Sequence, residues 1–79
     1  MIHFIDTEIS TVLDYFADKK ILMVDSETDG AFDFNNKIIL LQLGDRENQF
    51  VIDVRKVDIK GLRSLFLSDK IKIFHNAKF

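Results

Sequence analysis

The stretch ILMVDSETDG, from Ile21 to Gly30, carries the strongest indication of the fold and of the chemistry. Its first four residues are apolar without polar alternation, which predicts a short strand buried on both faces. Two acids follow at positions i and i+2, so the side chains of Asp25 and Glu27 are expected to project together, with Cα atoms about 7 Å apart. Carboxylates at the end of a buried strand must be paired, protonated or bound to a cation, because an isolated buried charge is too costly.

Three interpretations of this acidic segment stand side by side. In the first, Asp25 and Glu27 hold a hard divalent cation such as Mg²⁺, which binds one or two carboxylates together with substrate phosphate oxygens. Two such ions can stabilise the attacking and leaving oxygens of a phosphoryl displacement. In the second, the strand ends at Val24 and the acids lie in a solvated turn. In the third, residues 25–36 form a calcium loop with acids at its first, third and fifth positions, although Asn36 replaces the bidentate Glu of the last position.

Hydrophobic periodicity predicts helices and strands on both sides of this segment. Apolar residues at helical spacing indicate a helix from Ile9 to Ala17, capped by Asp6 or Thr7, and a second helix over residues 58–68. An extended or strand-like start precedes the first helix. Three further strands are expected, at residues 37–43, 49–54 and 71–74. The phenylalanines that fit these apolar patterns are expected in the core: Phe4, Phe16, Phe50, Phe66 and Phe74.

Composition indicates one small domain and excludes several classes of protein. The 79 residues carry 11 basic and 13 acidic side chains, a formal net charge of −2, and 47% of the positions are apolar, which is too apolar for a disordered chain. The absence of cysteine excludes a disulfide framework and a cysteine-ligated zinc site. The longest apolar runs are four residues, whereas roughly 18 to 20 are needed to span a bilayer. We therefore expect a cytoplasmic protein with no membrane partner.

The charges are unevenly distributed along the chain. Residues 21–33 hold four acids and no base, whereas residues 55–78 hold seven bases and two acids. A uniformly basic nucleic-acid binder has a different pattern, so a polyanionic partner is expected to reach the acidic segment with the help of metal ions. Lys70, Lys72 and Lys78 are candidates for phosphate contacts, or else belong to a solvated face.

Four segments, in order, resemble the DEDD 3′-to-5′ exonucleases, the group that contains the proofreading domains of family A DNA polymerases and the ribonuclease D enzymes. VDSETDG at 24–30 resembles the family's D-x-E first motif. ILLQLGD at 39–45 and QFVIDV at 49–54 resemble its second and third strands, and FHNAKF at 74–79 resembles the start of its second motif. The resemblance covers nearly the whole chain and implies that residues 1–79 are the N-terminal portion of a single exonuclease domain.

The resemblance also implies a fold and a set of site residues. The fold would be a truncated ribonuclease H-like mixed sheet, with three antiparallel strands, a helix, and a fourth strand parallel to the first. Asp25 would bridge two divalent metal ions and Glu27 would bind the ion that activates water, which makes both residues catalytic. Thr28 would lie beside the 3′-terminal nucleotide. Phe32 would contact the terminal base, because Ala31 stands where polymerase-type members often carry a leucine wedge.

The segment that resembles the second motif contains two polar residues. Asn76 is either a substrate contact, as the resemblance implies, or the cap of a helix that begins at Ala77. His75 is interpreted as the polar end of a strand, since the family assigns it no catalytic role. The family's second-motif aspartate would come directly after Phe79, so the 79 residues alone are expected to show no exonuclease activity.

Taken together, the residues and the resemblance predict part of a two-metal-ion 3′-to-5′ exonuclease that hydrolyses terminal phosphodiesters with Mg²⁺ or Mn²⁺. The HNAKF form of the second motif favours the 3′ end of single-stranded DNA as the substrate, and a polymerase domain in the parent chain is a further expectation. The alternatives are a ribonuclease D-like enzyme acting on RNA, a non-catalytic ribonuclease H-like module, and the calcium-binding loop described above.

Overall fold

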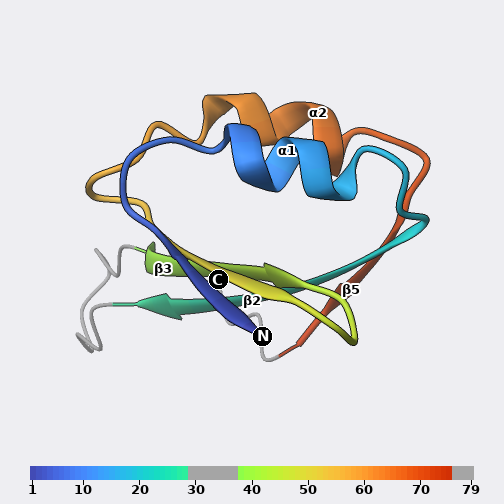
Figure 1. Cartoon of the computed structure of the whole chain (residues 1–79), viewed down its shortest axis with the longest axis horizontal. Helices are drawn as coiled ribbons and strands as arrows, with labels where there is room; N and C mark the ends of the chain where they lie inside the picture. The colour runs from blue at the N-terminus through green and yellow to red at the C-terminus, as the bar shows by residue number, and fades with distance from the viewer. Residues whose placement is uncertain (29–37, 76–79) are drawn as a thin grey trace.

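A computed structural model describes residues 1–28 and 38–75, in which strands and helices alternate along the chain (Figure 1). The strands are β1 (Ile2–Ile5), β2 (Ile21–Thr28), β3 (Ile38–Gly44), β4 (Gln49–Asp53) and β5 (Ile71–Phe74). The helical segments are α1 (Ser10–Phe16), the short 3₁₀ helix η1 (Lys60–Leu62) and α2 (Arg63–Phe66).

The described strands form one mixed sheet in the order β1-β4-β3-β2-β5. β3 pairs antiparallel with both β2 and β4, while β5 runs parallel to β2. At the other edge, β1 runs parallel to β4, so the expected extended start is a true strand. The three antiparallel strands with a later strand parallel to the first of them confirm the predicted ribonuclease H-like fold class.

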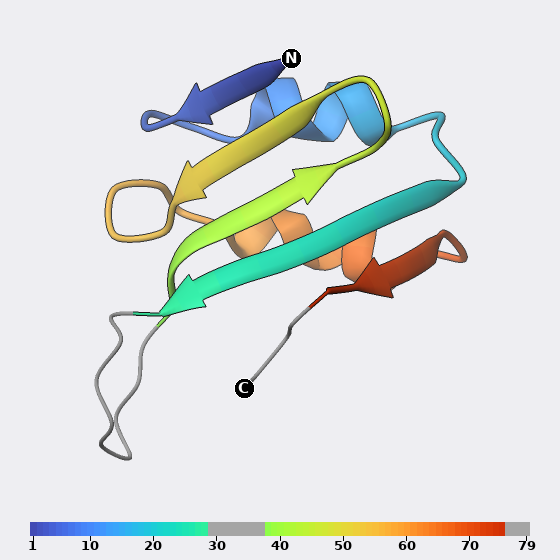
Figure 2. The same cartoon turned by 90° about the horizontal axis from the view of Figure 1, so that it is seen from below.

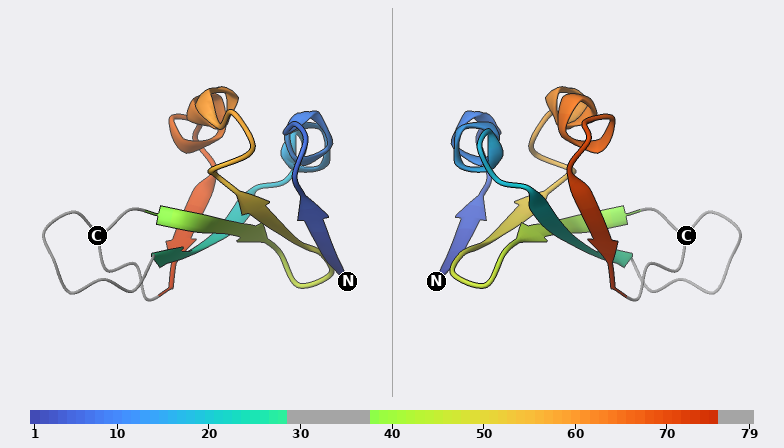
Figure 3. Two further views of the ribbon diagram at one scale, coloured as in Figure 1. Left: turned by 90° about the vertical axis from the view of Figure 1, so that its left-hand side faces the viewer. Right: turned by 90° about the vertical axis from the view of Figure 1, so that its right-hand side faces the viewer.

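The helices cover one face of the sheet and enclose the core. Figures 1 and 3 show α1 and α2 side by side over this face. Phe16, Leu22 and Leu43 are among the largest fully buried side chains, and they join α1 to the two central strands β2 and β3. The complete set of buried apolar residues is Ile9, Val12, Phe16, Leu22, Val24, Leu41, Leu43, Phe50, Ile52, Val57, Leu62 and Leu65.

The opposite face of the sheet is open in the part of the chain that the structure describes, as the view from below shows (Figure 2). Ile21 and Met23 of β2 are 44% and 39% exposed, and Ile71 and Ile73 of β5 are 61% and 46% exposed. The prediction that residues 21–24 are buried on both faces is therefore wrong for this face. An apolar run shows that both sides of a strand are apolar, but it does not show which element covers each side.

Two of the five phenylalanines expected in the core are exposed instead. Phe4 and Phe74 lie on the edge strands β1 and β5, where a side chain has a neighbouring strand on one side only. Phe16 and Phe50 are buried, and Phe66 packs partly buried against the core.

The first helix differs from its predicted bounds at both ends. Its N-cap is Ile9, which makes no side-chain cap bond, and the Glu8 carboxylate accepts a hydrogen bond of 3.0 Å from the Ser10 N–H. Capping by Asp6 or Thr7 is therefore wrong: a neighbouring carboxylate takes up an N–H of the first turn instead. α1 ends at Phe16, so Ala17 is not part of the buried stripe.

The second helical region is shorter than the predicted residues 58–68. The Asp58 carboxylate accepts a hydrogen bond from the Lys60 N–H at 2.9 Å, which stabilises a turn before the helical segment. Regular α-helix is confined to α2. Gly61 allows η1 to approach the start of α1, because an added Cβ would come within 2.9 Å of Cδ1 of Ile9. Within the described ranges, no helix is both long and apolar enough to cross a membrane.

A polar network fixes α1 to the β3–β4 turn. The Tyr15 hydroxyl donates to Oδ2 of Asp45 at 2.5 Å and accepts from Nδ2 of Asn48 at 3.1 Å. Nε2 of His3 lies 2.9 Å from Oδ1 of Asn48, which brings β1 into the same network. The Tyr15 bond lowers the pKa of Asp45 below its usual value, and the Asp45 acceptor raises the pKa of Tyr15.

We expect the free energy of unfolding of Tyr15→Phe to fall less on acidification than that of the wild type. A carboxyl group whose pKa is lowered by folding stabilises the fold above its unfolded pKa, and this stabilisation is lost as the pH falls through the folded value. Loss of the hydroxyl removes the main cause of the Asp45 shift, so the variant should lose less stability than the wild type between neutral pH and about pH 3. Urea unfolding at both pH values measures this difference. An equal loss in the two proteins would show that the hydrogen bond has no such linkage.

Candidate functional site

Strand β2 places both predicted carboxylates on the open face of the sheet. Side chains alternate along a strand, so the buried Leu22 and Val24 point toward the helices while Asp25 and Glu27 point away from them. β2 continues to Thr28 because it pairs with β3, in which Gln42 lies opposite Asp25. The register shifts only after Glu27, where an irregularity ends the regular pairing.

This geometry decides between the interpretations of the acidic segment. A strand that ends at Val24, with its acids in a turn, is wrong, since both acids belong to paired strand. A calcium loop is inconsistent with the same pairing, because its first and third ligands lie in a loop that follows a helix. The remaining positions of that loop, residues 29–36, lie outside the described residues. The structure places the two carboxylates on one face, as the first interpretation requires, and the binding of a cation by them stays a prediction.

Asp25 has contacts on its own strand and with the residue that follows β5. Its Oδ1 atom accepts a hydrogen bond from the Ser26 N–H at 2.8 Å, and its Oδ2 atom lies 3.9 Å from Nδ1 of His75. The His75 N–H in turn donates to the Val24 carbonyl at 2.9 Å, which extends the β2–β5 pairing by one residue. The side chain of His75 is 75% exposed and that of Asp25 is 34% exposed, so both groups are open to a ligand.

A shallow hollow of about 180 Å³ surrounds this contact. Four of its lining residues carry polar side chains: Asp25 and Gln42 on β2 and β3, Gln49 at the start of β4, and His75 just after β5. The other lining residues are Met23, Val24, Leu43 and Gly44. Among the described residues, 1–28 and 38–75, no three carboxylate or imidazole side chains lie close enough together to hold a metal ion by themselves. Asp25 and Glu27 nevertheless suit a hard cation that keeps water or substrate oxygens as its other ligands.

The other predicted site residues are less fully described. Thr28 closes β2, directly after the two carboxylates, but its side chain lies outside the described part, as do Phe32 and Asn76. The contacts expected for these three residues therefore stay predictions. Sequence reasoning missed Gln42 and the position of His75. The signal for His75 was present: His75 follows Ile71 by the same four residues that separate Asp25 from Ile21, and these two isoleucines are register partners.

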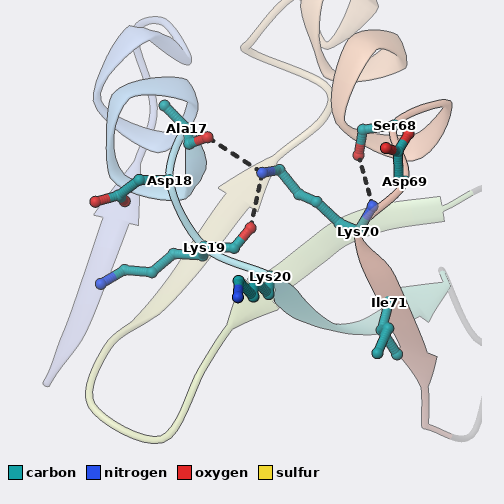
Figure 4. Close-up of a pocket in the computed structure, with 8 residues that line it drawn as sticks. All are labelled: Ala17, Asp18, Lys19, Lys20, Ser68, Asp69, Lys70 and Ile71. Atoms are coloured by element: carbon teal, nitrogen blue, oxygen red, sulfur yellow. Dashed lines mark hydrogen bonds between the residues drawn. The ribbon is translucent and has the colours of Figure 1, made fainter.

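Lys70 and Lys72, the described candidates for phosphate contacts or a solvated face, both donate hydrogen bonds within the protein, and their phosphate contacts stay a prediction. The Lys70 ammonium donates to the carbonyls of Ala17 at 3.2 Å and Lys19 at 2.7 Å, just beyond the end of α1 (Figure 4). A cation at this place also complements the negative end of the helix dipole. Lys72 donates to the carbonyl of Ser68. Lys70 helps to line a hollow of about 530 Å³ at the start of β2, the opposite end of that strand from Asp25. Lys78 lies outside the described residues.

Comparison with known proteins gives a consistent result. A family model described as a 3′-5′ exonuclease matches residues 3–79. The fold is similar to Escherichia coli RNase D, described as an exoribonuclease involved in structured RNA processing, with 20% identity, a TM-score of 0.82, and coverage of 96% of this chain and 21% of that one. No curated protein matches the chain in sequence.

Two further solved structures are similar. The catalytic core of RRP6 from Trypanosoma brucei has 21% identity and a TM-score of 0.78, with 98% of this chain and 23% of that one covered. The EXO domain of Aedes aegypti Nibbler has 20% identity and a TM-score of 0.74, with 95% and 38% covered. The chain thus spans between about a fifth and two fifths of these structures. At these identities, the likeness shows the fold.

Proposed function

The chain belongs to the 3′-to-5′ exonuclease family, and from this membership we propose that it supplies the first pair of metal-binding carboxylates of a nuclease that removes nucleotides from a 3′ end. The observation that carries the proposal is the placement of Asp25 and Glu27 on one face of β2. This is the placement that the family's D-x-E motif requires for both carboxylates to reach the same site.

In this proposal Asp25 and Glu27 would hold the divalent cations, Mg²⁺ or Mn²⁺. Such cations supply electrostatic stabilisation of the attacking and leaving oxygens during phosphodiester hydrolysis. The protein's part is orientation: pairing with β3 fixes the direction of both side chains, and the Ser26 N–H holds one oxygen of Asp25. Further ligands would come from residues other than these two, since two carboxylates do not complete a two-metal site.

The proposed substrate is the 3′ end of a single-stranded nucleic acid. The HNAKF sequence of residues 75–79 supports DNA, because it resembles polymerase-type second motifs, and such a nuclease would accompany a polymerase domain in a parent chain. RNA is the second candidate, and the fold similarity to E. coli RNase D, described as an exoribonuclease, supports it. Thr28, Phe32 and Asn76 are the proposed contacts to the terminal nucleotide.

Mn²⁺ binding to the 79-residue chain tests the metal part of this proposal. Mn²⁺ is paramagnetic, so its binding should broaden the amide NMR signals of residues near Asp25 and Glu27 before any others. Binding in the millimolar range is expected, because a pair of carboxylates without further protein ligands leaves most coordination positions to water. Asp25→Asn and Glu27→Gln should each remove the selective broadening.

Glu47→Gln is a matched control for this titration. Glu47 is an exposed acid in the β3–β4 turn, so its replacement removes one negative charge without touching β2. The broadening should be unchanged in this variant. A non-catalytic module would show broadening spread over all acidic residues, equally in the wild type and in all three variants, and this pattern would overturn the proposal.

A further inference from the structure

The register of β2 and β5 brings an imidazole to the Asp25 carboxylate. Residues 21–24 pair in parallel with residues 71–74 in steps of one, and the His75 N–H continues this pattern by donating to the Val24 carbonyl. The next register partners are therefore Asp25 and His75, whose side chains point to the same face. Oδ2 of Asp25 lies 3.9 Å from Nδ1 of His75.

A third polar group completes the arrangement from the other side of β2. Gln42 is the register partner of Asp25 in β3, and residues directly opposite each other project to the same face of a sheet. The hollow of about 180 Å³ is lined by all three side chains. Residues with a carboxylate, a carboxamide and an imidazole are thus placed next to one another by three adjacent strands or their ends.

This set of donors differs chemically from a set of carboxylates. Mg²⁺ strongly prefers oxygen ligands, whereas Zn²⁺ accepts both imidazole nitrogen and carboxylate oxygen, at about 2.0–2.2 Å. Two ligands of one tetrahedral ion at such bond lengths stand roughly 3.3 Å apart. The observed 3.9 Å differs from this by about half an ångström, which a small rotation of the exposed His75 side chain can close.

We propose that Asp25, Gln42 and His75 form a site for a divalent transition-metal ion that accepts imidazole, and that this ion competes with Mg²⁺ for Asp25. The inference rests on the proposed function in that it shares Asp25 with the proposed nuclease site, and it adds His75 as a ligand that selects among cations. Zn²⁺ is the probe.

Calorimetric titrations of the 79-residue chain with Zn²⁺ and with Mg²⁺, both at neutral pH, test the proposal. His75→Gln should lower the Zn²⁺ affinity at least about tenfold, because loss of even a supporting group of a metal site costs about 10- to 100-fold, and it should leave the Mg²⁺ affinity unchanged. Asp25→Asn should lower both affinities. Added Mg²⁺ should weaken Zn²⁺ binding in the wild type.

The chain contains two histidines, and the other one provides a matched control. His3 stands in β1, beside Asn48, so His3→Gln removes an imidazole without altering the hollow. This variant should bind Zn²⁺ as the wild type does. The ¹⁵N signals of the two imidazoles report ligation directly: only those of His75 should move on addition of Zn²⁺. Amide spectra verify that each variant is folded.

The possible results separate this inference from the proposed function. An unchanged Zn²⁺ affinity in His75→Gln, movement of the His3 signals instead, or no Zn²⁺ binding at all would overturn the transition-metal site, even if Mn²⁺ still binds at Asp25 and Glu27. Zn²⁺ binding that needs His75 and Asp25, in a chain that shows no selective Mn²⁺ broadening, would support the new site and overturn the nuclease proposal.

Discussion

Asp25→Asn is expected to lower the rate of 3′-to-5′ hydrolysis by about a thousandfold or more in an exonuclease that contains this chain. Metal ions contribute several kcal/mol of transition-state stabilisation in such reactions, and each 1.4 kcal/mol corresponds to about a factor of ten in rate. The variant keeps the size of the side chain, and Asp25 is partly exposed on the open face, so the fold should be retained. The lower rate of hydrolysis would therefore result from the loss of catalysis and not from unfolding.

The measurement is the release of mononucleotides from 3′-labelled single-stranded DNA and RNA, assayed in parallel with Mg²⁺ and with Mn²⁺. Glu47→Gln serves again as the charge-matched control and should retain full activity. The 79 residues alone are expected to release nothing, because Asp25 and Glu27 do not complete a two-metal site. Turnover by the 79-residue chain that Asp25→Asn abolishes would contradict this expectation, and a fully active Asp25→Asn variant would contradict the proposed role of the residue.

Phe16→Ala is expected to remove most of the stability of the fold. Phe16 is fully buried, and its ring contacts those of Tyr15 and Phe50 edge-on. Truncating a buried phenylalanine to alanine costs about 3–5 kcal/mol. At about 0.05–0.15 kcal/mol per residue, a chain of 79 residues has a free energy of unfolding of roughly 4–12 kcal/mol. The lower part of this range is expected here, because none of the described elements covers the second face of the sheet.

Urea unfolding followed by far-UV circular dichroism measures this effect. Phe4→Ala is the matched control, since Phe4 is 79% exposed on the edge strand β1, and a surface substitution changes the free energy of unfolding by about 0.5 kcal/mol or less. Equal losses in the two variants would show that the core over α1 does not carry the stability assigned to it.

The sequence predicted the order of the elements well because hydrophobic patterns are local. β5 occupies the predicted residues, β3 ends one residue later than predicted and β4 one residue earlier. β2 was underestimated, since residues 25–28 are polar and only their pairing with β3 keeps them extended. Strand propensity depends on such distant partners more than on the residues themselves. α2 was overestimated, because the Asp58 turn interrupts a helical apolar pattern.

The candidate site was predictable in part for the same reason. Asp25 and Glu27 could be recognised together, since they are two residues apart on one strand. His75 and Gln42 could not be joined to them without the β2–β5 and β2–β3 registers, which are properties of the folded sheet. Lys70 is a similar case: its carbonyl partners lie about 50 positions earlier in the chain, beyond the reach of a local pattern.

The alternation along β2 has a consequence for how the sheet assembles. If β2 paired with β3 one residue out of step, every side chain would change face. Asp25 and Glu27 would then enter the space beneath the helices, and Leu22 and Val24 would face water. Such a mispaired strand loses apolar burial and also acquires buried charges, so it is penalised twice. The two carboxylates thereby disfavour misaligned pairing of β2 with β3 during folding, and this effect needs neither a metal ion nor a substrate.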